Sequence, residues 1–293
     1  MTYPTASGKG KLPPSLFLPS CAGISPGEVW RWYQNVAAEL EVGDFLPHER
    51  EYLRGYYEEV GLLTTWKDRF FHQHFSKNFW AASRFLMEAE PRPTIVDLGC
   101  GCGTQSLFLA LKGARLISLD MDPVALSLAE KRKRFYEEKL QRGLDVTVRC
   151  LNVFDFDFGA FAPVHGLYSQ FAFNMMQPTG KLLESISPHF HPRARVAILD
   201  GNILCWLSRL LPSRHRNVCS PPQLRKEFEA RGFHVEEHCG GIVLPPFAWK
   251  LLPNGWISKT DTILGRKWFF PVSHQIFAQK NGPNRSAQTS CSA

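Results

Sequence analysis

A glycine-rich loop that directly follows an apolar run is the feature that most constrains this chain. The sequence IVDL over 95–98 leads into GCGCG over 99–103, and Thr104 follows. Glycine at alternate positions lets the backbone turn tightly and lets a ligand approach without a clash with a Cβ atom. The N–H groups at the start of the following helix are expected to face that ligand. The segment therefore predicts a strand, a tight turn and a helix around a small charged metabolite.

A dinucleotide site is the main alternative for such a loop. It requires the pattern GxGxxG, in which the third glycine brings the helix against the strand and the pyrophosphate lies at the helix N-terminus. Here Thr104 occupies that third position, and Asp97 lies two residues before the first glycine. A carboxylate so close to the loop repels a pyrophosphate and attracts an amino group. The residues therefore favour a ligand that carries a cation.

Two further polar positions follow at the ends of the next two apolar runs. Asp120 lies 21 residues after the first glycine, and its carboxylate can accept hydrogen bonds from both hydroxyls of a ribose. Asn152 and Val153 follow the third run, where a polar side chain and a backbone N–H could read an adenine edge; Asp155 is the alternative to Asn152. The three positions together predict a nucleoside with an amino-acid tail.

At these residues the sequence resembles the class I S-adenosylmethionine-dependent methyltransferases. Residues 96–104 resemble their first motif, residues 119–123 resemble their second, and the resemblance covers about 93–280. It implies S-adenosylmethionine as the cofactor and a seven-stranded sheet. It also implies roles for single residues: Asp97 and the backbone of Gly99, Cys100, Gly101 and Gly103 at the methionine part, Asp120 at the ribose, Met121 at the adenine face, and Asn152 with Val153 at the adenine edge.

Short β-type runs alternate with amphipathic helical patterns from residue 93 onward. This alternation predicts an α/β fold with a doubly wound, mostly parallel sheet and helices on both faces. We expect a helical N-terminal cap over 26–90 and the sheet domain over 91–280. The segments 1–25 and 281–293, rich in Pro, Gly and Ser, are expected to be disordered tails. An aromatic insertion between the late strand runs 235–239 and 273–280 is expected to cover the C-terminal edge of the sheet.

Composition limits the remaining classes of protein. The chain has 293 residues, 44% of them hydrophobic and 21% charged, which is typical of a globular protein. Its eight cysteines include no CxxC pair, so we expect reduced thiols and a cytoplasmic protein. The net charge is +7, but the densest basic run, 131–134, falls within a predicted helix, which favours a solvated face over a nucleic-acid patch.

Few residues stand out as catalytic candidates. Methyl transfer depends mainly on alignment and on exclusion of water, so it needs no conspicuous base. His74 lies on an aromatic helical face and is a candidate general base; Tyr168 and Gln170, at the end of the expected fourth strand, are the polar candidates near the methyl group, and Gln170 is also assigned to the cofactor. His72 and His74 face apart on a helix, so no metal site is predicted.

The expected methyl acceptor is a small, apolar or lipid-like molecule. Residues 169–178 lack the Asn/Asp-Pro-Pro-Tyr/Phe sequence of family members that modify base amines. They are apolar and aromatic instead, which suits a pocket for an uncharged molecule, although Phe171 and Phe173 fit a core equally well. The apolar run 203–211, followed by basic residues, fits either a lid helix or peripheral contact with a membrane. A monomer or homodimer is expected.

Two alternatives to this enzyme stay open. The positive charge is compatible with an RNA- or DNA-directed methyltransferase, although the dispersed charge disfavours nucleic acid as a partner. The absence of an assured base is compatible with a module that binds the cofactor without transferring a methyl group.

Overall fold

The computed structural model describes residues 16–20, 23–59, 75–205, 219–240 and 273–282, together with residues 243, 252, 256, 259–260, 263–264 and 271. Its helices are α1 Pro26–Val42, α2 Pro47–Glu59, α4 Lys77–Met87, α5 Thr104–Leu111, α6 Pro123–Leu140, α7 Thr179–Ile186 and α9 Pro221–Ala230. Its strands are β1 Thr94–Leu98, β2 Arg115–Asp120, β3 Val146–Cys150, β4 Val164–Gln170, β5 Phe190–Gly201, β6 Phe233–Gly240 and β7 Ser273–Lys280. Short 3-10 turns are η2 Val153–Asp155, η3 Phe158–Phe161, η4 Phe173–Met175 and η5 Ser187–His189.

The strands form one sheet with the order β3-β2-β1-β4-β5-β7-β6. The pairs from β3 to β5 are parallel, whereas β7 runs antiparallel to both of its neighbours, β5 and β6. The direction in which successive strands are added reverses between β1 and β4. A crevice opens at such a switch point, at the carboxyl ends of the strands. The predicted fold class, a doubly wound and mostly parallel seven-stranded sheet, is confirmed.

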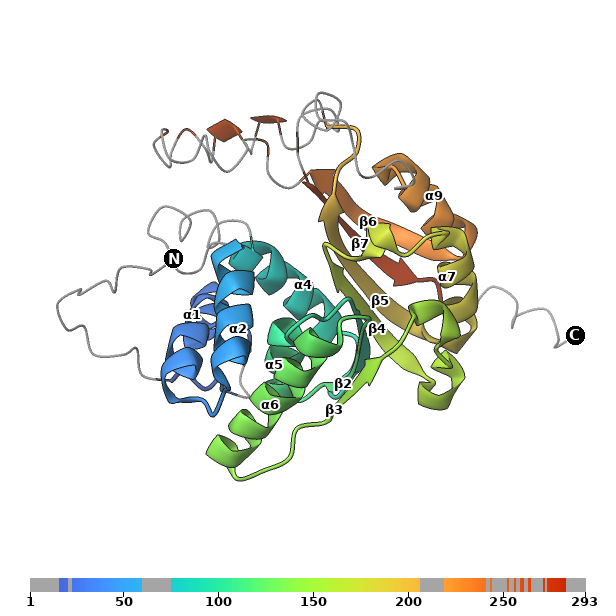
Figure 1. Ribbon diagram of the computed structural model, residues 1–293. Helices are drawn as coiled ribbons and strands as arrows, with labels where there is room; N and C mark the ends of the chain where they lie inside the picture. Colours follow the sequence, from blue (N-terminus) through green and yellow to red (C-terminus); the bar gives the residue numbers. More distant parts are fainter. Residues whose placement is uncertain are drawn as a thin grey trace, which may run out of the picture.

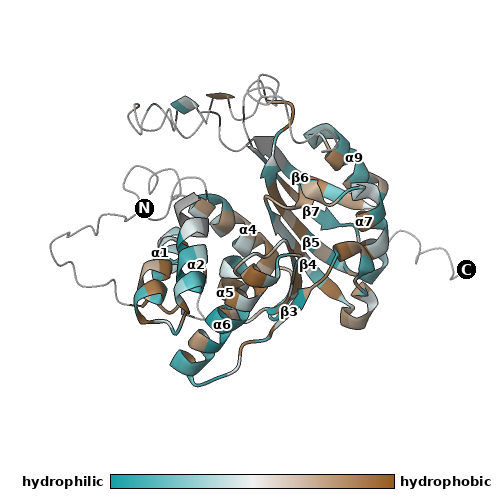
Figure 2. Ribbon diagram, in the orientation of Figure 1, coloured by the Kyte–Doolittle hydropathy of each residue, from teal (hydrophilic) through white to brown (hydrophobic). Residues whose placement is uncertain are grey.

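Helices cover both faces of the sheet, with α4, α5 and α6 on one side and α7 and α9 on the other (Figure 1). Within β1, Ile95 belongs to the first of these apolar layers and Val96 to the second, as the alternation of side chains along a strand requires. Hydrophobic residues concentrate in the strands and in α5, whereas α2 is largely hydrophilic (Figure 2). Since both faces are covered, the strands that flank the switch point are almost entirely buried.

The helix boundaries follow the capping residues. The side chain of Asp122 accepts hydrogen bonds from the N–H groups of Val124 and Ala125, and Pro123 occupies the first turn of α6, as the sequence predicts. Asn152 caps η2 in the same way by accepting from Phe154 N. Strand β3 ends at Cys150, so Asn152 and Val153 follow the strand, as expected.

The N-terminal helices pack directly against the sheet domain. Val29, Trp32 and Tyr33 of α1 are buried in the same apolar layer as α4 and α5, on the face that the periodicity predicts. Trp32 Nε1 donates to the carbonyl oxygen of Thr104, at the start of α5, over 2.8 Å. The division into a cap over 26–90 and a domain over 91–280 stays a prediction, but the two share one core.

A buried ion pair joins α1 to α6 and to the glycine loop. Arg132 is 1% exposed and Glu39 is not exposed at all, and their side chains form two hydrogen bonds of 2.5 and 3.0 Å. Arg132 Nη1 also donates to Cys102 O and Thr104 Oγ1. Lys131 pairs with Glu49 of α2. The expectation of a solvated basic face over 131–134 is therefore wrong at these two positions, because the carboxylates that neutralise them come from helices distant in sequence.

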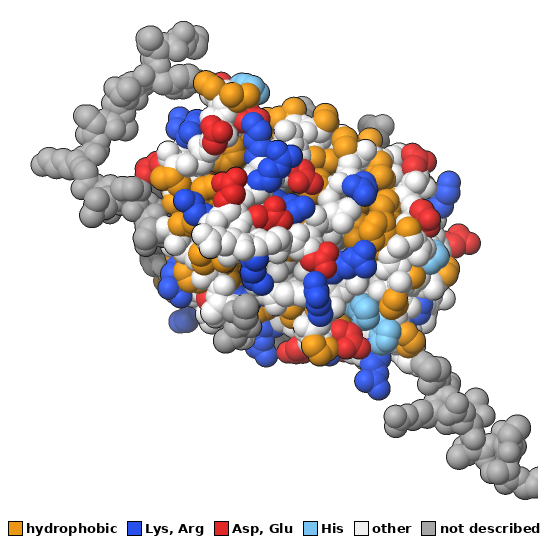
Figure 3. Space-filling model, turned by 90° about the horizontal axis from the view of Figure 1, so that it is seen from below, with side chains coloured by type: hydrophobic (Ala, Val, Ile, Leu, Met, Phe, Trp, Pro, Cys, Tyr) orange, Lys and Arg blue, Asp and Glu red, His pale blue; other side chains and the backbone are white. Residues whose placement is uncertain are grey.

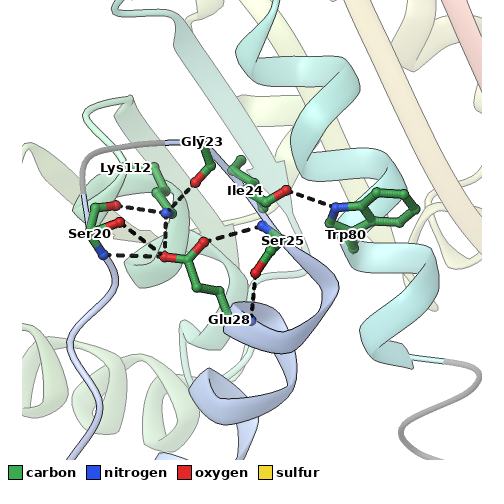
Figure 4. Close-up of polar contacts among 7 residues, drawn as sticks. All are labelled: Ser20, Gly23, Ile24, Ser25, Glu28, Trp80 and Lys112. Atoms are coloured by element: carbon green, nitrogen blue, oxygen red, sulfur yellow. Dashed lines mark hydrogen bonds and ion pairs between the residues drawn. The ribbon is translucent and has the colours of Figure 1, made fainter.

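A second buried cation fixes the segment that precedes α1 (Figure 4). Lys112 Nζ donates to Glu28 Oε1 over 2.8 Å and to the carbonyl oxygens of Ser20 and Gly23, each over 2.7 Å. Burial alone would raise the pKa of Glu28, but Lys112 and the N–H of Ser25 hold it below its ordinary value. The described residues 16–20 and 23–25 are thus ordered by hydrogen bonds, in contrast to the disordered tail expected over 1–25.

Several expectations concern residues outside the described ranges. His74 is one of them, and so are most of the apolar run 203–211 and most of the aromatic insertion between β6 and β7. Among the residues that the structure does describe, no helix has the length and apolarity that crossing a membrane requires.

We expect replacement of Arg132 by methionine to lower the free energy of unfolding by about 3–5 kcal/mol, because Glu39 would stay buried without its cation. Urea unfolding followed by circular dichroism measures this loss. Arg225→Met is the matched control, since Arg225 and Glu229 form a half-exposed i,i+4 pair, and its effect should stay within about 1 kcal/mol. Equal effects of the two substitutions would contradict a structural role for the buried pair.

Candidate functional site

A cleft of about 670 Å³ opens at the carboxyl ends of β1, β2 and β4, beside the switch point of the sheet. This volume lies within the range of ~300–1,000 Å³ that is usual for ligand sites. The wall is formed by the glycine loop, the ends of the strands and residues of α1 and α2. The cleft is therefore the candidate functional site.

The glycine loop forms the floor of the cleft. Gly99 has φ +74°, and a Cβ atom on it would lie 2.1 Å from the Cβ of Ala172, so only glycine fits. Gly103 also has φ +74°, and a Cβ atom there would lie 3.0 Å from the Cβ of Ala129 in α6. Gly99, Cys100 and Gly101 line the cleft, whereas Gly103 serves the packing of α5 against α6. Gly99 and Gly103 are thus each required to be glycine, but by contacts with different residues.

The N–H groups of the first three loop residues are already hydrogen bonded within the protein, whereas the expectation of a ligand concerns the N–H groups at the start of α5. Gly99 N and Cys100 N both donate to the carbonyl oxygen of Leu119, and Gly101 N donates to Asp120 Oδ2 over 2.8 Å. The parallel strand β2 ends at the height of the loop and supplies these acceptors, which the local sequence does not reveal. At Gly99 and Gly101 the loop offers a ligand backbone that no side chain covers.

Asp97 is a buried carboxyl group at the base of the cleft. It is 2% exposed and accepts a hydrogen bond of 2.5 Å from Ser106 Oγ of α5. Burial raises the pKa of Asp97 to about 7, the Ser106 bond opposes the rise and the nearby Asp120 adds to it. In the protein without a ligand, this group is therefore poised to change its charge near neutral pH.

Two more carboxylates line the cleft where β2 gives way to α6. Asp120 accepts hydrogen bonds from the N–H groups of Gly101, Met121 and Asp122, which fix its orientation. Asp122 accepts from the phenol of Tyr52, which reaches it from α2. That bond and the backbone N–H groups of α6 keep the pKa of Asp122 below its ordinary value, although burial opposes them. Three carboxylates thus share one wall.

The opposite end of this wall is flat and partly exposed. Met121 is 68% exposed and lines the cleft beside Asn152 and Val153. Asn152 is oriented by its hydrogen bond to Phe154 N, so its amide group is held at the rim. Asp155, the alternative to Asn152, is exposed and does not line the cleft.

A network of neutral polar groups closes the other end of the cleft. Tyr168 is 2% exposed, and its hydroxyl donates to Gln170 Oε1 over 2.5 Å. Gln105 Nε2 donates to the same oxygen over 3.1 Å and to the hydroxyl of Tyr33 over 3.2 Å. Because both bonds end on Oε1, the amide of Gln170 has one orientation, with its NH₂ group directed away from these partners.

Aromatic and methionine side chains surround this network. The ring of Phe171 lies 5.5 Å from that of Phe75, and Phe171 has φ +58°, a strained conformation for a residue with a side chain. Met175 and Met176 complete the wall, and Met175 is 76% exposed. Phe173, by contrast, is fully buried against the core. Of the two phenylalanines that the sequence left undecided, one lines the cleft and the other does not.

The structure thus brings most of the predicted site residues into one cleft: Asp97, Gly99, Cys100, Gly101, Asp120, Met121, Asn152, Val153, Tyr168 and Gln170. Sequence reasoning missed Tyr33, Tyr52, Phe75 and Gln105. The helical periodicity places Tyr33 on a buried face but gives no sign of what that face covers. The sequence does contain an indication for Gln105, because a polar residue in the first turn after the glycine loop lies close to the ligand site.

Comparisons with known proteins give likeness in fold. No family model and no curated protein matches the sequence. Among solved structures, the chain is similar to the plantazolicin methyltransferase BpumL in complex with SAH (16% identity, 87% of this chain and 97% of that chain, TM-score 0.47). It is also similar to a SAM-dependent methyltransferase from Aquifex aeolicus (16% identity, 74% of this chain and 98% of that chain, TM-score 0.45). A further similar structure is that of the [4+2]-cyclase SpnF (15% identity, 69% of this chain and 80% of that chain, TM-score 0.48). At such identities and TM-scores, activity has to follow from the chemistry of the cleft itself.

The raised pKa of Asp97 predicts a pH-dependent stability. The unfolded chain loses this proton near pH 4 and the folded protein near pH 7, so the stability that the buried neutral acid provides is complete below about pH 4 and is lost as the pH rises through 7. Relative to Asp97→Asn, the wild type should lose at most about 4 kcal/mol over this range. Urea unfolding of both proteins between pH 4.5 and about 8 measures the difference, and parallel curves would contradict the assignment.

Proposed function

We propose that this protein is an S-adenosylmethionine-dependent methyltransferase that acts on a small, uncharged, apolar acceptor. One observation carries the proposal: the cleft lies on a loop where Gly99 and Gly101 present bare backbone, it is lined by the carboxylates of Asp97, Asp120 and Asp122, and no Lys or Arg lines it within the described residues. A wall of this charge favours a ligand that carries positive groups and disfavours a pyrophosphate.

The residues of the cleft fit this cofactor, which combines a sulfonium and an amino group with a ribose and an adenine. Asp97 would hold the amino group, and the carboxylate of Asp120 would accept from the ribose hydroxyls. Met121, Val153 and Asn152 would contact the adenine. When bound, S-adenosylmethionine supplies an electrophilic methyl group.

The chain's own contribution to such a reaction is alignment and the exclusion of water. The network of Tyr33, Gln105, Tyr168 and Gln170 would orient the acceptor, because each of its side chains is held by another. Positioning of reacting groups can supply about 7–11 kcal/mol of the barrier reduction. His74 stays a candidate general base that lies outside the described residues, and Tyr168 is the candidate within the cleft.

The lining of the acceptor end supports a small, apolar substrate. Phe75, Phe171, Met175 and Met176 provide apolar surface, and the polar groups beside them are neutral amides and phenols. Among the described lining residues, an anionic acceptor would find no counter-charge and would face the three carboxylates instead. A lipid-like or aromatic molecule with one nucleophilic atom suits this environment best.

Nucleic acid is the less favoured substrate. Phosphate contacts need clustered Lys and Arg side chains, but none lines the cleft among the residues that the structure describes, and Lys131 and Arg132 are engaged by the carboxylates of α2 and α1. On the face shown in Figure 3, basic side chains are interspersed with acidic ones. This favours a metabolite over RNA or DNA.

Two measurements test the proposal. Calorimetric titration with S-adenosylmethionine and S-adenosylhomocysteine should give saturable binding of both. Incubation with methyl-labelled cofactor should then transfer label into an organic-solvent extract of small molecules, and not into RNA or DNA. Binding without any transfer would favour the module that only binds the cofactor, and label in RNA would favour the nucleic-acid alternative. Failure of both ligands to bind would overturn the proposal.

Substitution of Asp120 by alanine should weaken binding of S-adenosylhomocysteine about 10- to 100-fold, because hydrogen bonds to a charged group contribute about 1.5–3 kcal/mol. Calorimetry at pH 7.5 gives the two dissociation constants. Asp155→Ala is the matched control, because this exposed carboxylate is not among the residues that line the cleft and its removal should leave the affinity unchanged. An unchanged affinity in Asp120→Ala would remove the ribose role from this residue.

Asp97 should make the affinity of the protein for S-adenosylhomocysteine depend on pH. An amino group binds to the ionised carboxyl, so the affinity should rise as the pH increases toward about 7, the pKa of Asp97 in the free protein. It should fall again above about 8, where an α-amino group loses its proton. At pH 6 binding should release a proton, which calorimetry detects as a heat that changes with the buffer. The acidic limb should be absent in Asp97→Asn, and its persistence there would assign it to another group.

A further inference from the structure

A second group of ionisable side chains lies at the amino ends of the strands, whereas the cleft lies at their carboxyl ends. Glu90 belongs to the connection between α4 and β1, and His165 and His191 lie near the starts of β4 and β5. The cleft opens at the carboxyl ends of the strands, so this group is separated from it by the length of the sheet. Within the described ranges, it is the group of His, Cys, Asp and Glu side chains whose arrangement suits a metal ion.

The geometry brings three ligand atoms together. One atom from each of Glu90, His165 and His191 lies within 4.8 Å of the other two. The two imidazole rings lie side by side, with centroids 4.9 Å apart and an interplanar angle of 31°. All three side chains are half-buried, so water and ions can reach them while the strands hold their backbones in place. Parallel pairing of β4 with β5 fixes the two histidines as neighbours.

Backbone hydrogen bonds already occupy one ring nitrogen of each histidine. Thr94 N donates to His165 Nδ1, and Arg193 N donates to His191 Nδ1, each over 3.2 Å. The Nε2 atoms are therefore the ones left for a third partner. Burial and the neighbouring His191 lower the pKa of His165, while Glu90 opposes this.

We propose that Glu90, His165 and His191 bind one zinc ion through a carboxylate oxygen and the two Nε2 atoms. Two imidazoles and one carboxylate are a typical zinc ligand set, and three protein ligands leave the fourth tetrahedral position to water. With bonds of about 2.0–2.1 Å, the ligand atoms would approach to about 3.4 Å from one another. Half-buried side chains can make this movement by rotation about their own bonds.

Zinc binding would break existing hydrogen bonds of the two histidines, and this loss limits the affinity for zinc. In each neutral ring the hydrogen lies on Nε2, because Nδ1 accepts a backbone N–H. Coordination through Nε2 moves that hydrogen to Nδ1, so the two backbone hydrogen bonds of 3.2 Å are lost and no proton is released from a neutral ring. We therefore expect a dissociation constant in the micromolar range, weaker than that of a site formed by thiolates. Zinc would join the α4–β1 connection to the starts of β4 and β5 and would stabilise the folded chain.

The experiment is a zinc titration of the untagged, metal-free protein in competition with a chromogenic chelator. The wild type should bind one zinc ion. Loss of an outer-shell partner typically costs ~10–100-fold in metal affinity, so loss of a ligand in His165→Ala or His191→Ala should cost about 100-fold. Cobalt(II) should give the visible absorption of a tetrahedral complex in the wild type only. Zinc should also raise the melting temperature of the wild type and not that of these variants.

His189→Ala is the matched control, because this half-buried histidine lies two residues before His191 and outside the group. It should bind zinc as the wild type does. Circular dichroism of each metal-free variant verifies that it is folded, and Glu90→Gln, which keeps the size of the side chain, gives a second test of the ligand set. Absence of zinc binding by the wild type, or equal binding by the double variant of His165 and His191, would overturn the proposal. None of these readouts depends on methyl transfer.

Discussion

The buried ion pair between Arg132 and Glu39 is the interaction on which the rest of the site depends. It connects α1 and α6, and the same guanidinium holds the carbonyl oxygen of Cys102 and the hydroxyl of Thr104. The glycine loop, in which three of the five residues have no side chain to pack, is thus held from behind by a rigid cation. A fully desolvated charge of this kind requires its partner in place, so the loop, the cap helix and α6 form one unit.

Charge is arranged in opposite ways on the two sides of that unit. Behind the loop, Lys112 and Arg132 are matched by Glu28 and Glu39. In front of it, the cleft wall carries carboxylates without a matching Lys or Arg among the described residues. The cleft therefore retains a negative potential of its own, in a site where low polarity strengthens electrostatic interactions. Burial is the main cause of the raised pKa of Asp97, and the negative charge of Asp120 adds to it.

The parts of the structure that were predictable from sequence are those that depend on neighbours along the chain. The glycine loop, the caps of α6 and the burial of Trp32 and Tyr33 follow from local pattern, and the strand order places Asp97 and Asp120 on one cleft. Contacts between distant segments were not predictable. In the sequence, Arg132 looks like any other charged residue of a hydrophilic helix, because its partner Glu39 is distant along the chain. The carbonyl oxygen of Leu119 accepts hydrogen bonds from the loop only because β1 and β2 pair in register.

The buried ion pairs also limit which parts of this protein can change independently during evolution. A shorter ancestor that began at β1 would have held Lys112 and Arg132 inside the fold without the carboxylates of α1, and Asp122 without the phenol of Tyr52. The helical segment and the sheet therefore cannot be exchanged as independent modules. A chimera that takes the sheet from this chain and its N-terminal helices from another would have to inherit the acidic positions 28 and 39 as well.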